Sequence, residues 1–240
     1  MANGYSQSPK LHKGALIQFS APLLIPVPNI IIFQYNPETM TRMITPWKQS
    51  ENAGGAECSK DTVTAVNPLA QPIDPEETFN LTLELDAADA LEDPDNNRVA
   101  VIAGVADRLA ALEMLLYPPG DSGIGNLVSG IRSALGGKAA DVVQRKTVQV
   151  VLFYWGLGRI LPVRIESFSV EEQAYSPTLF PIRATVTLGL KILDAASFGD
   201  ETSATVKLAK ACYLYTRAQK ETLALARIAN ESLLGKILPL

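Results

Sequence analysis

Three apolar runs follow one another between Thr147 and Leu193, and this stretch constrains the fold more than any other. The runs are Thr147–Trp155, Ile160–Val170 and Pro181–Leu193, and Gly156-Leu157-Gly158 closes the first of them. Such runs are rich in β-branched and aromatic residues, which suit a pleated and partly buried surface. Their short connections favour pairing between consecutive strands. The stretch therefore predicts a β-meander that forms the body of a barrel or sandwich.

Further strands are expected earlier in the chain. Thr78–Asp86 alternates cleanly, which places its large apolar side chains on one face of a strand. These side chains are Phe79, Leu81, Leu83 and Leu85. Lys13–Ser20 and Ile30–Tyr35 are also predicted as strands. After a turn at Asn36-Pro37-Glu38, Thr39–Thr45 is predicted as the returning strand.

Two helical regions complete the expected elements. Arg98–Leu116 is predicted as one amphipathic helix on the sheet, capped by Asn96 or Asn97. Its expected apolar stripe is Val101, Val105, Leu109, Leu112 and Leu116. The Ala-rich stretch Asp200–Leu234 is predicted as one long helix or two short ones. The residues available for its stripe are Leu208, Cys212, Tyr215, Leu223, Leu225 and Ile228.

These elements predict an α+β chain that is predominantly β. Residues 1–12 are expected to be a flexible leader, 13–195 the β-domain and 196–240 a C-terminal helical extension. Two long loops, 46–77 and 118–146, are rich in Gly, Pro and Ser. Loops of that length inside a compact domain are usually functional or become ordered against a partner. A short strand at Thr62–Val66 and a short helix within Asp121–Lys138 are possible inside them.

Composition excludes several classes of partner. The net charge is −4 and the Lys and Arg residues are scattered, so a nucleic-acid surface is not expected. No run of eighteen apolar residues occurs, so no membrane insertion is expected. Cys58 and Cys212 lie far apart in the sequence, which fits reduced thiols in the cytoplasm better than a disulfide framework.

The sequence contains no constellation that indicates catalysis. His12 is the one histidine, so a metal site or a His-based triad has little to build on. The acidic residues between Glu84 and Asp95 lack the spacing of a calcium-binding loop, and a solvated strand end is the simpler interpretation. We therefore expect neither an enzyme nor a cofactor.

Several local motifs resemble proteins of contractile injection systems, the phage-tail-like particles. Phe33-Gln34-Tyr35-Asn36-Pro37-Glu38 resembles the opening motif of their tube-type proteins, and Val151–Gly156 resembles a strand ending in Trp-Gly. Pro181-Ile182-Arg183-Ala184 is similar to the end of their closing hairpin. The similarity runs in order through about residues 13–193. The motif residues that it marks for assembly are Phe33, Asn36, Pro37, Trp155, Gly156, Pro181 and Arg183.

The resemblance implies a tail-tube-like antiparallel β-barrel or sandwich with a packed helix. It implies a structural component that joins the inner tube and spike hub to the baseplate, assembled as a six-fold homo-oligomeric ring. Its partners would be tube, spike-hub and baseplate wedge proteins. Some relatives carry a C-terminal LysM module, where this chain has an Ala-rich helix. A tube subunit or tube terminator is an alternative, and a ligand- or glycan-binding β-domain is an alternative of another class.

Overall fold

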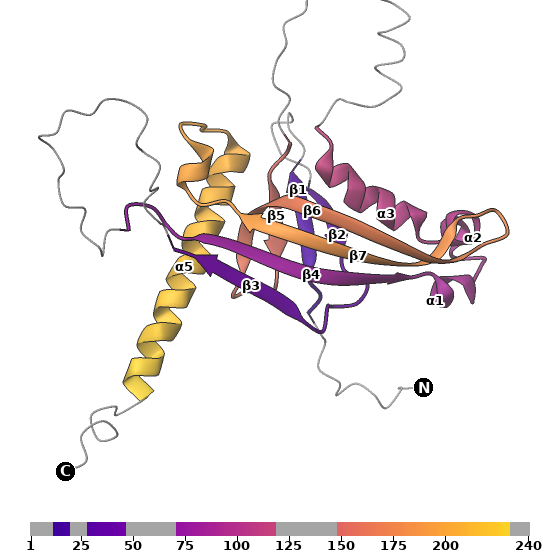
Figure 1. The fold of residues 1–240 in the computed structure, drawn as a ribbon, viewed down its shortest axis with the longest axis horizontal. Coiled ribbons are helices and arrows are strands. Elements are labelled where there is room, and N and C mark those ends of the chain that lie inside the picture. The colour runs from indigo at the N-terminus through magenta and orange to yellow at the C-terminus, as the bar shows by residue number, and fades with distance from the viewer. Residues whose placement is uncertain (1–11, 20–27, 47–70, 119–147, 231–240) are drawn as a thin grey trace, which may run out of the picture.

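The computed structural model describes residues 12–19, 28–46, 71–118 and 148–230. Within these residues, seven strands form one antiparallel sheet in the order β2-β1-β5-β6-β7-β4-β3 (Figure 1). The predicted α+β class, mostly sheet with a C-terminal helix, is confirmed. The sheet is open and not closed into a barrel, because β2 and β3 are its two edges. The predicted elements at Thr62–Val66 and Asp121–Lys138 lie outside the described residues, as do most of both long loops and the leader up to residue 11.

The elements have the following bounds. The strands are β1 (Ala15–Phe19), β2 (Pro28–Ile32), β3 (Met40–Thr45), β4 (Glu76–Asp86), β5 (Val151–Tyr154), β6 (Ile160–Tyr175) and β7 (Pro181–Ile192). The helices are α1 (Ala88–Leu91), α2 (Arg98–Ala103), α3 (Ala106–Glu113) and α5 (Ala204–Asn230), with short 3₁₀ turns η1 (Met114–Leu116) and η2 (Ala196–Phe198).

The predicted meander forms the centre of the sheet. β5 pairs with β6 and β6 pairs with β7, both antiparallel. β4 lies on the other side of β7, with Leu83 opposite Val186. The alternation predicted for β4 is confirmed, because its four large apolar side chains are at most 5% exposed. Burial of each contributes about 1.5–3 kcal/mol, so a one-residue slip of register would be strongly unfavourable.

The predicted hairpin between Ile30–Tyr35 and Thr39–Thr45 is wrong. β2 ends at Ile32 and pairs with β1, whereas β3 pairs with β4 at the opposite edge of the sheet. Asn36-Pro37-Glu38 predicts a turn from local residues. Which strand the chain pairs with after the turn depends on residues far away in the sequence. Phe33, which is 2% exposed, anchors the chain after β2 in the core, and the residues that follow lead to β3 at the other edge of the sheet.

The helix predicted at Arg98–Leu116 is interrupted at Gly104. This glycine has φ +57° and ψ −122°, which separates α2 from α3. Val105, Leu109 and Leu112 are buried as predicted, but Val101 is 47% exposed and Leu115 is buried in place of Leu116. Asn97 occupies the N-cap position of α2, but its side chain accepts no cap hydrogen bond; its amide nitrogen donates to the carbonyl of Asp93.

α5 is a single helix of 27 residues that crosses one end of the sheet (Figure 1). The stripe predicted for its packing face is wrong. Of those residues only Cys212 is half-buried, and the others are 39–68% exposed. The buried residues of α5 are Val206, Ala209 and Thr216. Small side chains let the helix approach β6 closely, so the larger leucines remain on the surface.

Candidate functional site

Three of the seven motif residues, Phe33, Asn36 and Trp155, contact Gly14. The Phe33 N–H donates to the Gly14 carbonyl at 2.9 Å, and the Gly14 N–H donates to Asn36 Oδ1 at 2.8 Å. The rings of Phe33 and Trp155 have centroids 6.4 Å apart. A Cβ on Gly14 would lie 2.7 Å from atoms of both rings, so this close packing requires glycine. These motif residues therefore fix the start of β1 against the ends of β2 and β5.

Gly156 closes the turn that follows Trp155. The Trp155 N–H donates to the Arg159 carbonyl at 2.8 Å, and Gly156 has φ +74°. Pro37 is half-buried in the segment that leads from Phe33 to β3. Both residues shape connections between strands.

Pro181 and Arg183 lie apart from this group, at the beginning of β7. The Pro181 carbonyl accepts from the Val105 N–H at 2.9 Å, which ties β7 to the start of α3. Arg183 forms an ion pair with Asp86 at 2.7 Å across the β4–β7 pair. The seven residues thus form two groups, and their expected role in contacts between subunits stays a prediction.

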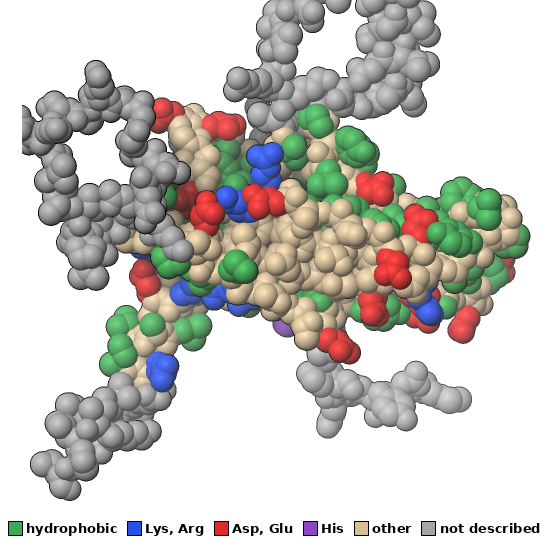
Figure 2. Space-filling model, viewed as in Figure 1, with side chains coloured by type: hydrophobic (Ala, Val, Ile, Leu, Met, Phe, Trp, Pro, Cys, Tyr) green, Lys and Arg blue, Asp and Glu red, His purple; other side chains and the backbone are tan. Residues whose placement is uncertain are grey.

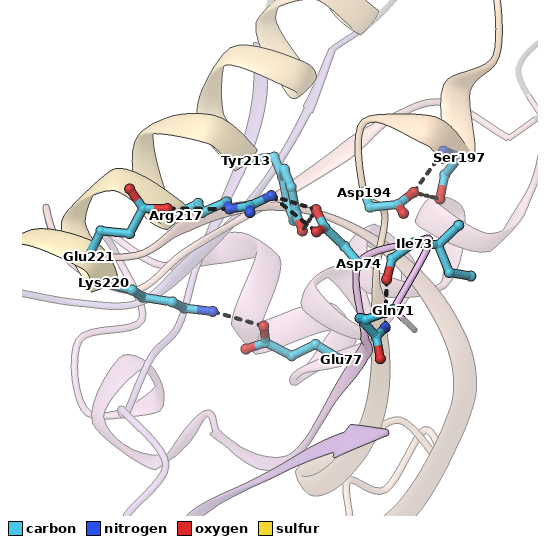
Figure 3. A network of polar contacts seen from close by, with 10 residues as sticks. All are labelled: Gln71, Ile73, Asp74, Glu77, Asp194, Ser197, Tyr213, Arg217, Lys220 and Glu221. Atoms are coloured by element: carbon cyan, nitrogen blue, oxygen red, sulfur yellow. Dashed lines mark hydrogen bonds and ion pairs between the residues drawn. The ribbon is translucent and has the colours of Figure 1, made fainter. Parts of the chain in front are cut away.

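A charged cluster that the sequence analysis missed surrounds Glu77, and Figure 3 shows the contact of Glu77 with Lys220. Glu77 is 9% exposed on the inner face of β4, and it pairs with Arg42 of β3 and with Lys220 of α5, the latter at 2.8 Å. Burial alone would raise the pKa of Glu77, but hydrogen bonds from Arg42 and Lys220 and their charges bring it below its ordinary value. The sequence did contain a signal for this cluster. Glu77 and Phe79 are two residues apart, so the alternation of β4 places both side chains on its buried face.

Arg159 adds a third cation to this region. Its guanidinium lies 5.3 Å from the centroid of the Phe79 ring, and Arg42 lies 6.0 Å from the same ring. Burial and then repulsion from Arg42 lower the pKa of Arg159, and Glu77 opposes this change. The cluster therefore joins β3, β4, the β5–β6 turn and α5 by charge and by cation–π contact.

Asp74 makes a second connection to α5. It accepts from the Tyr213 hydroxyl at 2.9 Å and from Arg217 at 2.9 and 3.0 Å (Figure 3). Burial and the neighbouring Asp74 carboxylate raise the pKa of the Tyr213 hydroxyl. Thr216 completes the connection, because its hydroxyl donates to the Ile160 carbonyl at 2.8 Å and accepts from the Ile160 N–H at 3.1 Å. The middle of α5 is therefore held firmly on the sheet.

A cleft of about 450 Å³ runs beside β2. Its apolar lining includes Ile30 and Ile32 of β2, Leu112 of α3, and Leu83 and Leu85 of the core. Its polar residues are Lys13, Asn29, Gln34, Asp107 and Arg108. Arg108 donates to the Gln34 side chain and to the Asp86 carbonyl, so much of this polar surface is already used in holding the fold.

Both edges of the sheet present hydrogen-bonding groups and apolar side chains. Within the described chain, β2 pairs with β1 alone and β3 with β4 alone. Because Phe33 turns its N–H toward β1, the alternation of an antiparallel pair turns the N–H and C=O of Ile30 and Ile32 outward. The side chains of Ile30, Ile32, Met43 and Ile44 are 47–61% exposed. Such edges are available for pairing with another strand.

The residues that the structure describes also bear on two other kinds of site. In this part of the chain, no three His, Cys, Asp or Glu side chains lie together so that they could hold a metal ion. No helix among the same residues has the length and apolarity needed to cross a membrane. Cys212 is a free, half-buried thiol, and burial raises its pKa.

No family model and no curated protein matches the chain. The fold itself defines an α+β protein built on an open, seven-stranded antiparallel sheet.

Proposed function

We propose that this protein is a structural subunit of a contractile injection system, which joins the inner tube and spike hub to the baseplate. It would assemble as a homo-oligomeric ring, six-fold in the expected particle, and contact tube, spike-hub and baseplate wedge proteins. The observation that carries the proposal is the open sheet, whose edge strands β2 and β3 both have outward backbone groups and exposed isoleucine or methionine side chains.

Ring assembly follows from the chemistry of the edges. An exposed strand edge binds another strand through main-chain hydrogen bonds, and each such contact repeats around a closed ring. β2 and β3 are different surfaces, so a contact between them would be head-to-tail and could close a ring. The contacts around Gly14 support the proposal, because the motif residues Phe33, Asn36 and Trp155 come from separate segments and meet at one place in the fold.

The alternative of an inner tube subunit or terminator uses the same sheet edges. α5 favours the adaptor at the baseplate, because tube subunits tend to be shorter. Lys220 and Arg217 hold this helix on the sheet, so it belongs to the folded unit and offers additional surface for a neighbour.

A ligand-binding domain is the second candidate, and the cleft beside β2 is the observation that favours it. Its volume lies within the range of small-molecule sites, roughly 300–1,000 Å³. Ala111→Phe would fill the cleft without removing its polar groups. A glycan that raises the melting temperature of the wild type and leaves that of Ala111→Phe unchanged would support this function.

The assembly proposal is tested at the β2 edge. Ile32→Lys places a charge beside the outward backbone groups, and the 61% exposed position should tolerate it. Electron microscopy of the purified wild type should show rings, and Ile32→Lys should lose them. Met114→Lys is the matched control, because Met114 is 55% exposed and belongs to η1, not to an edge strand. A wild type that stays monomeric and never enters particles would refute the proposal.

Truncation tests the contribution of α5 to incorporation into particles. Removal from Asp200 onward would take away Val206, Ala209 and Thr216, which are buried against the sheet. Truncation after Lys220 keeps these contacts as well as the ion pair with Glu77. The shorter chain should fold but enter particles poorly. Normal incorporation would show that the last part of α5 is not a docking element.

A further inference from the structure

Two arginine side chains lie over one aromatic ring, that of the fully buried Phe79. Arg42 of β3 has its guanidinium carbon 6.0 Å from the ring centroid, and Arg159 of the β5–β6 turn has its guanidinium carbon at 5.3 Å. Figure 2 shows Lys and Arg side chains gathered where β3 approaches α5 in this view. Like charges repel, so two arginines on the same ring need negative charge nearby.

Glu77 supplies negative charge, but other cations use its carboxylate. Its Oε1 accepts from Arg42 Nε, and its Oε2 accepts from Lys220 Nζ at 2.8 Å. Among the described residues, Glu77 is the carboxylate whose charge acts on Arg159, and neither of its hydrogen bonds involves that side chain. In the described chain, three cations therefore share one carboxylate, and an excess of positive charge remains beside Arg159.

The hydrogen-bond donors of Arg159 are unused within the part of the chain that the structure describes. A guanidinium has five N–H donors, and the contact that Arg159 makes there is the cation–π contact with Phe79. The side chain is half-buried, yet no fully buried side-chain nitrogen of the described residues lacks a partner, so these donors reach solvent. Arg42 bonds to Glu77 through Nε, which leaves its two Nη atoms without a bond to another described residue.

The electrostatics at Arg159 favour an anion. Burial lowers the pKa of Arg159, repulsion from Arg42 lowers it further, and the attraction of Glu77 is the smallest of the three effects. A bound anion would oppose the first two effects, because a nearby opposite charge favours the charged form. A cation–π contact at an exposed site contributes only about 0.5–1 kcal/mol. The cover that Arg159 gives to Phe79 therefore does not by itself account for a second arginine on this ring.

We propose that Arg159 and the Nη atoms of Arg42 form a binding site for an oxyanion, a carboxylate or a phosphate group. Planar guanidinium groups bind these anions through paired N–H donors, which a lysine does not have. Glu77 orients Arg42 through its Nε, and Lys220 holds the other oxygen of the Glu77 carboxylate. The site lies on the face of β4 that carries Glu77 and Phe79, and it does not depend on ring assembly.

Isothermal titration of the full chain with inorganic phosphate, at an ionic strength held constant with sodium chloride, tests the site. Arg159→Gln should weaken binding about tenfold or more, the effect of losing charge-assisted hydrogen bonds. Arg164→Gln is the matched control, because Arg164 is exposed and its register with Lys191 and Thr78 places it on the opposite face of the sheet. It should bind phosphate as the wild type does. Equal losses in both variants would overturn the proposal, since net charge alone would then explain the binding.

Arg159→Lys keeps the test decisive if Arg159→Gln does not fold. The lysine retains the positive charge and an apolar stem over Phe79, but it lacks the paired donors of a guanidinium. Circular dichroism should show the wild-type fold, and phosphate affinity should still fall several-fold. An affinity equal to that of wild type would contradict the role given to Arg159.

A hexaglutamate peptide, titrated in parallel with phosphate, distinguishes the two sources of the anion. Tighter binding of phosphate supports a free phosphate ligand, and tighter binding of the peptide supports an acidic side chain of a protein neighbour. Either result supports the site, provided that Arg159→Gln weakens it and Arg164→Gln does not. Failure of both probes to bind the wild type at millimolar concentration would overturn the proposal.

Discussion

Gly104 lies so close to Pro181 that a Cβ on the glycine would be 2.1 Å from the Pro181 carbonyl oxygen. The same oxygen accepts the Val105 N–H at 2.9 Å. This contact turns the chain between α2 and α3 and fixes both helices to the beginning of β7. It also connects the motif residue Pro181 to α2, whose Val99, Val101 and Ile102 are exposed.

Gly104→Ala should destabilise the protein by about 3 kcal/mol, because the new Cβ would clash with backbone and the φ of +57° would be strained. Urea unfolding followed by circular dichroism measures this change. Gly158→Ala is the matched control, since no atom lies within 4 Å of its added Cβ. Its effect should stay within about 0.5 kcal/mol. Equal effects of the two substitutions would contradict the role given to the Pro181 contact.

Glu77 should make the protein sensitive to acid. Its pKa in the fold is below its ordinary value of 4.5, so it stabilises the fold above that pH. That contribution is lost as the pH falls through the lowered pKa. The charges that face it are Arg42, Lys220 and Arg159. Glu77→Gln should therefore cost about 1–3 kcal/mol near neutral pH, and the difference from wild type should shrink in acid.

Chemical unfolding of both proteins at several pH values checks this prediction. Glu84→Gln is the control, because Glu84 lies on the same strand with its side chain exposed on the other face. It should leave the pH dependence of the free energy of unfolding as it is in wild type. A constant difference between Glu77→Gln and wild type down to pH 3 would show that the carboxylate charge is not what stabilises this cluster.

Thr216→Val should loosen α5 from the sheet. The substitution removes both hydrogen bonds between the threonine hydroxyl and Ile160, at a cost of about 1–3 kcal/mol because the groups are buried. Hydrogen exchange at the Ile160 amide should become faster. Thr222→Val is a fair comparison, since its hydroxyl bonds only within the exposed surface of α5. If hydrogen exchange at the Ile160 amide is unchanged in Thr216→Val, the Thr216 hydroxyl does not hold α5 on the sheet.

The sequence predicted those elements whose pattern reports burial directly. β4 alternates because one face lies on the core, and the meander from β5 to β7 follows from short connections. The sequence could not show that Gly104 interrupts a helical stripe, since the cause is a carbonyl from β7. Nor could it separate β2 from β3, because the turn between them is formed by local residues while their partners are β1 and β4.

α5 is a second element whose packing the sequence pattern did not predict correctly. Its leucines predicted a packing face, yet its buried positions are Val206, Ala209 and Thr216. Small side chains and ion pairs such as that between Lys220 and Glu77 hold the helix on the sheet. Its larger apolar side chains are exposed. Which apolar side chains of α5 are exposed is therefore known only once the fold gives the exposure of each residue.

Leu179→Gly should leave the free energy of unfolding of the isolated subunit nearly unchanged. Glycine relieves the left-handed conformation at φ +64°, which costs a leucine about 1–2 kcal/mol, but it adds roughly 0.5–1 kcal/mol of backbone entropy to the unfolded chain. The side chain is 79% exposed, so little burial is lost. Thermal unfolding of the monomer checks this balance. Leu188→Gly in the core of β7 is the contrast, and it should be strongly destabilising because Leu188 is fully buried. A large loss of stability in Leu179→Gly would mean that the leucine side chain packs within its own chain.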